Sequence, residues 1–272
     1  MQAGTDGGHA WGRIAPGDEM FDLNGRVAVV TGGNGGIGLG LARGLVAAGA
    51  TVVVAGRNAV KSRAAVDELS TIGRGSAIAI EVDVIEEASV QRLVSGTLDR
   101  CGRLDILVNN AGINVRKLPQ EITLDEWRRV MDTNLTSAYL CSHAAYPAMK
   151  AAGGGKVINI GSMMSIFGAG FVPAYAASKG GIVQFTKACA SAWARDNIQV
   201  NAILPGWIDT ELTKGAREQV PGLNENVLRR TPAGRWGLPD DFRGIAVFLA
   251  SAASDFVTGA AIPVDGGYSI QG

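Results

Sequence analysis

Short apolar segments rich in β-branched residues alternate along this chain with longer stretches whose apolar residues recur at helical spacing. Most of the short segments are apolar throughout, as expected of strands that are buried on both faces of a sheet. Strands separated by helices form parallel sheets through right-handed crossovers. The pattern predicts one α/β domain with a doubly wound parallel sheet of about seven strands, at Val27–Val30, Val52–Ala55, Ser76–Val82, Ile106–Val108, Lys156–Ile160, Gln199–Leu204 and Ala261–Val264.

The length of 272 residues is enough for a single large domain. We expect residues 1–21 to form a flexible tail and residues 22–272 to form the domain. Residues 207–238 break the alternation with Gly, Pro and charged residues, and an insertion after the carboxyl end of a strand commonly covers a substrate site. We therefore expect a lid there. Thr123–Lys150 is predicted to be one helical region with a kink or an early end at Pro147.

Composition excludes several classes of function. The 25 Lys and Arg residues balance 25 Asp and Glu residues, so no overall charge attracts nucleic acid or an anionic membrane. No apolar run approaches the roughly 20 residues that span a bilayer, and the tail lacks the apolar segment of a secretory signal. The cysteines and histidines have neither disulfide nor metal-ligand spacing. We expect a cytoplasmic enzyme without a catalytic metal and without nucleic acid or membrane partners.

A glycine-rich turn, Thr31-Gly-Gly-Asn-Gly-Gly-Ile-Gly38, joins the first predicted strand to the first predicted helix. Gly32 and Gly36 allow the backbone to turn tightly and approach a phosphate, and Gly38 allows the helix to pack close to the strand. The helix N-terminus adds unpaired N–H groups and the positive end of its dipole. This order of elements predicts a Rossmann fold that binds a dinucleotide.

A second group of residues predicts proton transfer. Tyr175 and Lys179 stand four residues apart, so they share one face of a helix. A lysine cation and the positive nicotinamide of an oxidised cofactor favour the phenolate and lower the tyrosine pKa from its ordinary value near 10. Tyr175 can then act as a general acid or base, while Ser162 at a strand end polarises the reacting oxygen. The group predicts hydride transfer between a nicotinamide and a secondary alcohol or ketone.

The glycine spacing resembles that of the short-chain dehydrogenase/reductase family, and more of the family's motifs follow in order between Asp22 and Gly267. The matching positions are Asp83, Asn109-Asn110-Ala111-Gly112, Asn134, Ser162, Tyr175, Lys179 and Pro205-Gly206-x3-Thr210.

The resemblance implies that Asp83 and Val84 contact the adenine, that Asn110–Gly112 covers the adenosine side, and that Ile208 and Thr210 hold the nicotinamide carboxamide. It also implies that Lys179 grips the nicotinamide ribose, that Asn134 keeps a water near that lysine, and that the chain forms a homotetramer. The full set of predicted cofactor contacts is Gly32, Asn34, Gly36, Ile37, Gly38, Arg57, Asp83, Val84, Asn110, Ala111, Gly112, Tyr175, Lys179, Pro205, Gly206, Ile208 and Thr210.

The end of the second strand bears on the choice of cofactor. A carboxylate there would bind the ribose 2′-OH and repel a 2′-phosphate, and the resemblance places Gly56 where NAD-preferring relatives carry Asp. Arg57 follows, and its guanidinium can pair with a phosphate. Against NADP, Gly35 stands where many NADP-using relatives carry a basic residue. We expect NADP in preference to NAD.

The expected substrate contacts are Arg116, Ser162, Met164 and Trp207, and an arginine beside an active site suits a substrate carboxylate. The stretches Ala111-Gly-Ile-Asn-Val-Arg116 and Thr231-Pro-Ala-Gly-Arg-Trp-Gly237 resemble the gluconate and deoxygluconate dehydrogenase branch, which favours a sugar acid or polyol. A 3-oxoacyl thioester reductase is the alternative enzyme. A cofactor-binding regulator without catalysis is an alternative of a different class, although such proteins usually lose the Tyr, Lys or Ser.

Overall fold

The computed structural model describes residues 19–271, so most of the predicted tail (1–21) lies outside the described residues. The seven strands form one sheet with parallel pairing throughout, in the order β3-β2-β1-β4-β5-β6-β7. The predicted fold class is confirmed, and every predicted strand coincides with an observed one. The strands are β1 Val27–Thr31, β2 Thr51–Gly56, β3 Ser76–Glu81, β4 Ile106–Asn109, β5 Gly155–Ile160, β6 Ile198–Pro205 and β7 Ala261–Val264.

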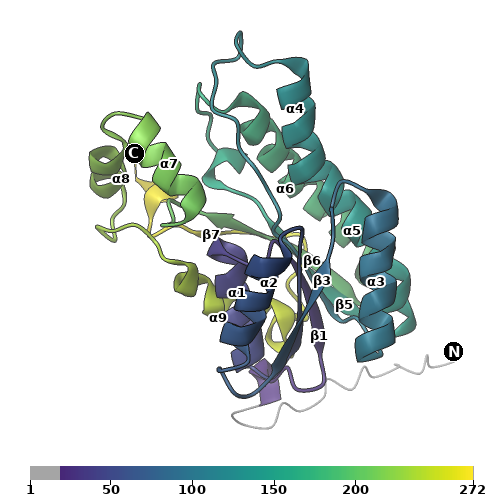
Figure 1. The fold of residues 1–272 in the computed structure, drawn as a ribbon. Helices are drawn as coiled ribbons and strands as arrows, with labels where there is room; N and C mark the ends of the chain where they lie inside the picture. Colours follow the sequence, from purple (N-terminus) through teal and green to yellow (C-terminus); the bar gives the residue numbers. More distant parts are fainter. Residues whose placement is uncertain (1–18, 272) are drawn as a thin grey trace, which may run out of the picture.

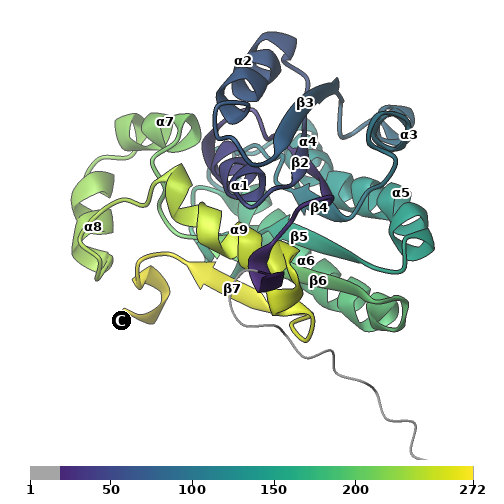
Figure 2. The same ribbon diagram turned by 90° about the horizontal axis from the view of Figure 1, so that it is seen from below.

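Helices cover both faces of the sheet (Figures 1 and 2). Because side chains alternate across a strand, Ala28 and Val30 pack with α1, α2 and α9, whereas Val27 and Val29 pack with α3, α5 and α6. No helix in residues 19–271 combines the length and apolar character needed to cross a membrane. The helices are α1 Gly36–Ala47, α2 Ala59–Leu69, α3 Glu87–Cys101, α4 Leu124–Met131, α5 Ser137–Ala151, α6 Pro173–Trp193, α7 Glu211–Gln219, α8 Leu223–Arg230 and α9 Arg243–Ala250.

The winding of the chain opens a crevice between β1 and β4. From β1 the chain proceeds outward to β3, and it then returns to β4 on the other side of β1 and proceeds to β7. The segments that leave β1 and β4 therefore run in opposite directions, and ligands of open α/β sheets bind at such a switch point. This arrangement brings the glycine turn after β1 next to the loop after β4.

The predicted helical region, Thr123–Lys150, is helical without a gap from Leu124 onward, as α4, a π-helix at Asp132–Thr136, and α5. The expected early end at Pro147 is wrong, because α5 continues through this proline to Ala151. Buried Ala145 and Met149 hold the last turns of α5 in the core, which compensates for the backbone hydrogen bond that proline removes. The α-helical hydrogen-bonding pattern changes instead at the π-helix, a feature that often marks functional sites.

Residues 207–238 contain two short helices, α7 and α8, which lie beyond the carboxyl ends of the strands (Figure 1). Aromatic and cationic side chains hold this segment together. The rings of Trp207 and Trp236 meet edge to face with centroids 5.7 Å apart, and the Arg217 guanidinium lies 3.8 Å from the centroid of the Trp236 ring. Such contacts stabilise a segment that has a small apolar core of its own.

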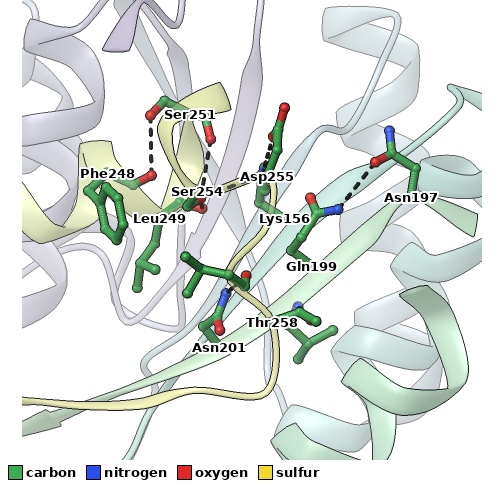
Figure 3. A network of polar contacts seen from close by, with 12 residues as sticks. Lys156, Asn197, Gln199, Asn201, Phe248, Leu249, Ser251, Ser254, Asp255 and Thr258 are labelled. Atoms are coloured by element: carbon green, nitrogen blue, oxygen red, sulfur yellow. Dashed lines mark hydrogen bonds and ion pairs between the residues drawn. The ribbon is translucent and has the colours of Figure 1, made fainter. Parts of the chain in front are cut away.

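A polar network fixes the segment between α9 and β7 against the sheet (Figure 3). The Lys156 ammonium on β5 pairs with Asp255 at 2.7 Å. On β6, the Asn201 amide donates to the carbonyl of Val257 at 2.7 Å and accepts from the backbone N–H of Ala260 at 3.0 Å. Asn201 is buried, so its side chain provides the hydrogen bonds that the Val257 carbonyl and the Ala260 N–H would otherwise make with water. This asparagine thereby sets the position at which β7 joins the sheet.

We predict that Asn201→Leu lowers the free energy of unfolding by about 2–4 kcal/mol, because it leaves two backbone groups without partners. Urea denaturation would measure the loss. Asn226→Leu is the matched control, since Asn226 is exposed and accepts a hydrogen bond only from Arg229. Equal stability of the two variants would contradict the role given to Asn201.

Candidate active site

Two clefts meet at the carboxyl end of the sheet. The glycine cleft, of about 1180 Å³, is lined by the turn after β1, the 110–112 segment and residues 205–213. The apolar cleft, of about 610 Å³, is lined by Asn114, Arg116, Met164, Phe171, Trp207 and their neighbours. Ser162 and Tyr175 line both clefts. A ligand group at the junction would therefore contact both hydroxyls.

The predicted catalytic residues come together from different elements. Ser162 follows β5, while Tyr175 and Lys179 lie one turn apart on α6. The buried Lys179 ammonium donates to the carbonyl of Ile160 at 2.6 Å and lies 5.6 Å from the centroid of the Tyr175 ring. The hydrogen bond ties α6 to the end of β5 and holds the amine beside the phenol.

Burial shifts the pKa values of both titrating groups toward their neutral forms. It lowers the pKa of Lys179 to about 8. It also raises the pKa of Tyr175, while a hydrogen bond from Ser162 and the positive charge of Arg116 act in the opposite direction. In the protein alone, burial thus dominates at Tyr175. The lowering of the Tyr175 pKa that the sequence predicts depends in part on the positive charge of an oxidised nicotinamide. It therefore stays a prediction for the enzyme with its cofactor bound.

Asn134 lies in the π-helix and braces the loop after β4. Its Oδ1 accepts from the backbone N–H of Ile113 at 2.8 Å, and its Nδ2 donates to the Ile113 carbonyl at 2.9 Å and to Ser178 Oγ at 3.0 Å. Both amide donors are used, and Asn134 connects this loop to α6. The water that the resemblance places near Lys179 stays a prediction.

Glycine is required at three positions of the turn after β1. Gly32 and Gly36 have φ values of +64° and +51°, in the left-handed region that favours glycine. A Cβ at Gly38 would overlap the Gly32 carbonyl and the Asn110 amide. Asn110 holds the turn from the other side, because its Nδ2 donates to the carbonyls of Thr31 at 3.0 Å and Gly32 at 3.1 Å. Asn110 therefore shapes the cradle as well as lining it.

Thr31 is a site residue that was absent from the predicted contacts. Its Oγ1 accepts from the backbone N–H groups of Asn110 at 3.0 Å and Ala111 at 3.1 Å and donates to the Val108 carbonyl at 3.2 Å. The sequence did contain a signal for this role, namely a hydroxyl at the end of an otherwise apolar strand. A hydroxyl buried there needs hydrogen-bond partners.

Most predicted cofactor contacts line the glycine cleft or lie beneath it, but three do not. Arg57 and Asp83 line a neighbouring hollow, where Arg57 Nη1 is 3.8 Å from Asp83 Oδ2, and Val84 is buried. Lys61 lines the glycine cleft and was not predicted. The signal for Lys61 was a basic residue four positions after Arg57, in the first turn of α2. The contacts in the cleft are Gly32, Asn34, Gly36, Ile37, Asn110, Ala111, Gly112, Tyr175, Lys179, Pro205, Gly206, Ile208 and Thr210.

All four predicted substrate residues, Arg116, Ser162, Met164 and Trp207, line the apolar cleft. Arg116 donates to the carbonyl of Leu212 at 2.8 Å and to Gln219 Oε1 at 3.3 Å. No carboxylate forms a salt bridge with Arg116 in the described part of the chain. Burial lowers its pKa, although the guanidinium stays charged at neutral pH. The apolar cleft thus contains an uncompensated positive charge.

The described residues include no group of three His, Cys, Asp or Glu side chains that could hold a metal ion, and the absence of a catalytic metal stays a prediction. Cys101, Cys141 and Cys189 are free thiols. Burial raises the pKa of Cys141 to about 12 and that of Cys189 to about 11. These two thiols therefore remain protonated and unreactive at neutral pH.

A doubly wound sheet with a glycine cleft at its switch point, and a Ser, Tyr and Lys group beside it, defines a nicotinamide-dependent oxidoreductase of the Rossmann type. Comparisons with known proteins specify the family. Residues 32–269 match a short-chain dehydrogenase model described as enoyl-(acyl carrier protein) reductase. The chain belongs to the short-chain dehydrogenase/reductase family, whose members are NAD(P)-dependent enzymes acting on CH–OH groups.

Similar proteins are named as sugar acid dehydrogenases or as an acyl-carrier-protein reductase. The chain is 43% identical to 2-dehydro-3-deoxy-D-gluconate 5-dehydrogenase of Escherichia coli K12, over 91% of this chain and 97% of the relative. It is 38% identical to 3-oxoacyl-[acyl-carrier-protein] reductase of Chlamydia pneumoniae, over 90% and 97%. The crystal structure of gluconate 5-dehydrogenase from Burkholderia cenocepacia, in complex with NADP and tartrate, matches with a TM-score of 0.87 and 40% identity, over 93% and 99%.

We predict that Gly38→Ala weakens dinucleotide binding about tenfold or more, because the added methyl group forces the Gly32 carbonyl and the Asn110 amide apart at a cost of about 1–3 kcal/mol. Fluorescence titration with NADPH and NADH would measure both dissociation constants. Gly244→Ala is the matched control, since it is also helical but has nothing within 4 Å of the added Cβ. Unchanged binding by the Gly38 variant would refute the close packing that we describe.

Proposed function

We propose that this enzyme transfers a hydride between NADP and a secondary hydroxyl or ketone group of a sugar acid, with Tyr175 as the general acid or base. One observation carries the proposal. Ser162 and Tyr175 stand where the glycine cleft meets a second cleft that contains the unpaired charge of Arg116. An acidic substrate held by Arg116 could present a carbon–oxygen bond to both hydroxyls.

Each residue of the group has a separate task. The residues that line the glycine cleft would hold the nicotinamide cofactor, which would provide the hydride-transfer chemistry of the reaction. In oxidation the Tyr175 phenolate takes the hydroxyl proton of the substrate, so that a ketone and a neutral phenol result, and in reduction the phenol returns this proton to the carbonyl oxygen. Ser162 donates a hydrogen bond to the same oxygen. Lys179 holds a positive charge beside the ring and thereby favours the phenolate.

The charge of Arg116 supports a carboxylate-bearing substrate. A half-buried guanidinium without an ion pair attracts an anion and can bind a carboxylate through two parallel hydrogen bonds. The names of the relatives agree, since the Escherichia coli protein is named for a sugar acid and the Burkholderia structure contains tartrate. The alternative, a 3-oxoacyl thioester reductase, draws support from the apolar walls formed by Phe171 and Trp207 and from the Chlamydia relative.

We also propose that residues 207–238 act as the lid. Leu212, Thr213 and Ala216, which belong to α7, line the apolar cleft, and Arg116 hydrogen-bonds to the same helix. A movement of α7 would therefore change the shape of the cleft and the position of the charge together. Such segments exclude water during hydride transfer.

The surroundings of β2 support NADP. A Cβ at Gly56 would lie 2.8 Å from Asn34 Nδ2, so the carboxylate that would bind a ribose 2′-OH has little space there. Arg57 is 70% exposed and its contact with Asp83 is long, which leaves it free to turn toward a phosphate. Lys61 lines the glycine cleft and would provide a second positive charge for the phosphate. It would thus replace the basic residue that many NADP-using relatives carry at the position of Gly35.

Three further expectations concern assembly, location and the alternative of a protein without catalysis. Assembly as a homotetramer and a cytoplasmic location stay predictions from the sequence. A regulator without catalysis is disfavoured, because Ser162, Tyr175 and Lys179 are all present and lie close together.

We predict that Tyr175→Phe lowers kcat at least 100-fold while NADPH still binds, because the variant keeps the ring but loses the proton that general acid–base catalysis transfers. The rate would be measured spectrophotometrically with a panel of aldonic and keto-aldonic acids, and binding by fluorescence. Tyr139→Phe, at an exposed tyrosine of α5, is the control. A kcat for Tyr175→Phe close to that of the wild type would remove Tyr175 from the mechanism.

We predict that Arg57→Ala raises KM for NADPH about tenfold and changes KM for NADH less than twofold, since a charged hydrogen bond to phosphate contributes about 1.5–3 kcal/mol. Arg63→Ala, at an exposed arginine of α2, is the matched control. Equal effects of Arg57→Ala on both cofactors would show that this guanidinium does not read the 2′-phosphate.

A further inference from the structure

We propose that Asn114 recognises a hydroxyl group of the substrate other than the one that reacts, and that it thereby selects polyhydroxylated acids. This inference rests on the proposed function and specifies its substrate class. Asn114 Oδ1 is buried and has no hydrogen-bond partner in the described part of the chain. The residue lines the apolar cleft with Arg116, Ser162 and Tyr175.

An unpaired buried acceptor is uncommon, because about nine in ten buried polar groups in proteins have a partner. In residues 19–271, the other buried side-chain atoms without a hydrogen bond belong to Asn109, Asp209 and Arg217, the last two of which form a salt bridge at 3.2 Å. None of these three residues lines the apolar cleft. A substrate that fills this cleft could supply the missing donor. The unpaired oxygen thus belongs to a residue that lines the cleft where the substrate is expected.

The backbone on both sides of Asn114 is anchored. The preceding residue, Ile113, is held through both its N–H and its carbonyl by the Asn134 side chain. Two residues later, Arg116 is tied to α7 through Leu212 and Gln219. The amide is therefore presented to the cleft from a fixed segment, and fixed polar groups give strong discrimination between substrates.

The chemistry of the amide oxygen identifies its partner. A carbonyl oxygen accepts hydrogen bonds, so it suits a hydroxyl and repels a carboxylate. Arg116 has only donors and suits the carboxylate. The cleft thus offers separate positions for an acid group, for a non-reacting hydroxyl and, at Ser162 and Tyr175, for the reacting carbon. The acyl chain of a 3-oxoacyl thioester carries neither of the first two groups.

The test compares the best sugar acid of an aldonic and keto-aldonic panel with each of its mono-deoxy analogues. For the wild type, we expect kcat/KM to fall about tenfold or more for one analogue. In Asn114→Leu this ratio should come within about twofold of one, because the oxygen that recognises the hydroxyl is gone. Arg116→Ala should keep the ratio and instead lose the preference for acids over neutral polyols. Asn226→Leu, outside both clefts, serves as the control.

The outcomes separate the inference from the proposed function. If the wild type turns over no sugar acid, the proposed function and this inference both fail. If it turns over sugar acids but accepts every deoxy analogue equally, or if Asn114→Leu retains the wild-type ratio, only the inference fails. NADPH binding and the melting temperature report whether Asn114→Leu is folded. If it is not, Asn114→Ala takes its place with the same expected ratio, since it adds no volume.

Discussion

Hydrogen bonds between the ends of β1 and β4 are the interaction on which the site depends. At this point the sheet reverses its direction of winding, and β1 and β4 are paired up to Val30 and Val108. Beyond the paired residues, the Thr31 hydroxyl accepts from the backbone N–H groups of Asn110 and Ala111, and the Asn110 side-chain amide donates to the carbonyls of Thr31 and Gly32. They fix the glycine turn relative to the loop that continues to Asn114 and Arg116. The cofactor cradle and the substrate cleft are therefore positioned by the same few bonds.

The active centre combines burial with a small number of charges. Burial lowers the pKa of Lys179 and raises that of Tyr175, so water exclusion alone favours a neutral amine and a neutral phenol. Positive charge from Arg116, and from an oxidised nicotinamide when it binds, acts against this preference at the phenol. The pKa of Tyr175 should therefore change when a charged ligand binds in either cleft.

Sequence patterns predicted the sheet and the proton-transfer group because both depend on local spacing. Buried parallel strands are continuous apolar runs, and Tyr175 and Lys179 are neighbours on one helix. The missed features depend on distant partners. Thr31 meets Asn110 across about 80 residues of chain, and the unpaired state of Asn114 is visible only once the cleft has formed. The π-helix at Asp132–Thr136 has no marker in composition, and α5 does not end early at Pro147 because its last turn is anchored in the core.

The contact between Arg116 and α7 would link ligand binding to the proposed lid at residues 207–238. A guanidinium has five N–H donors, and Arg116 uses two groups, Nη1 and Nη2, on Gln219 and Leu212. A carboxylate that binds the remaining donors would neutralise the charge while α7 stays attached. Binding linkage is reciprocal, so an anion that prefers this placement of α7 is itself held more tightly by it. Affinity for acids would then depend on the placement of α7 as much as on the arginine.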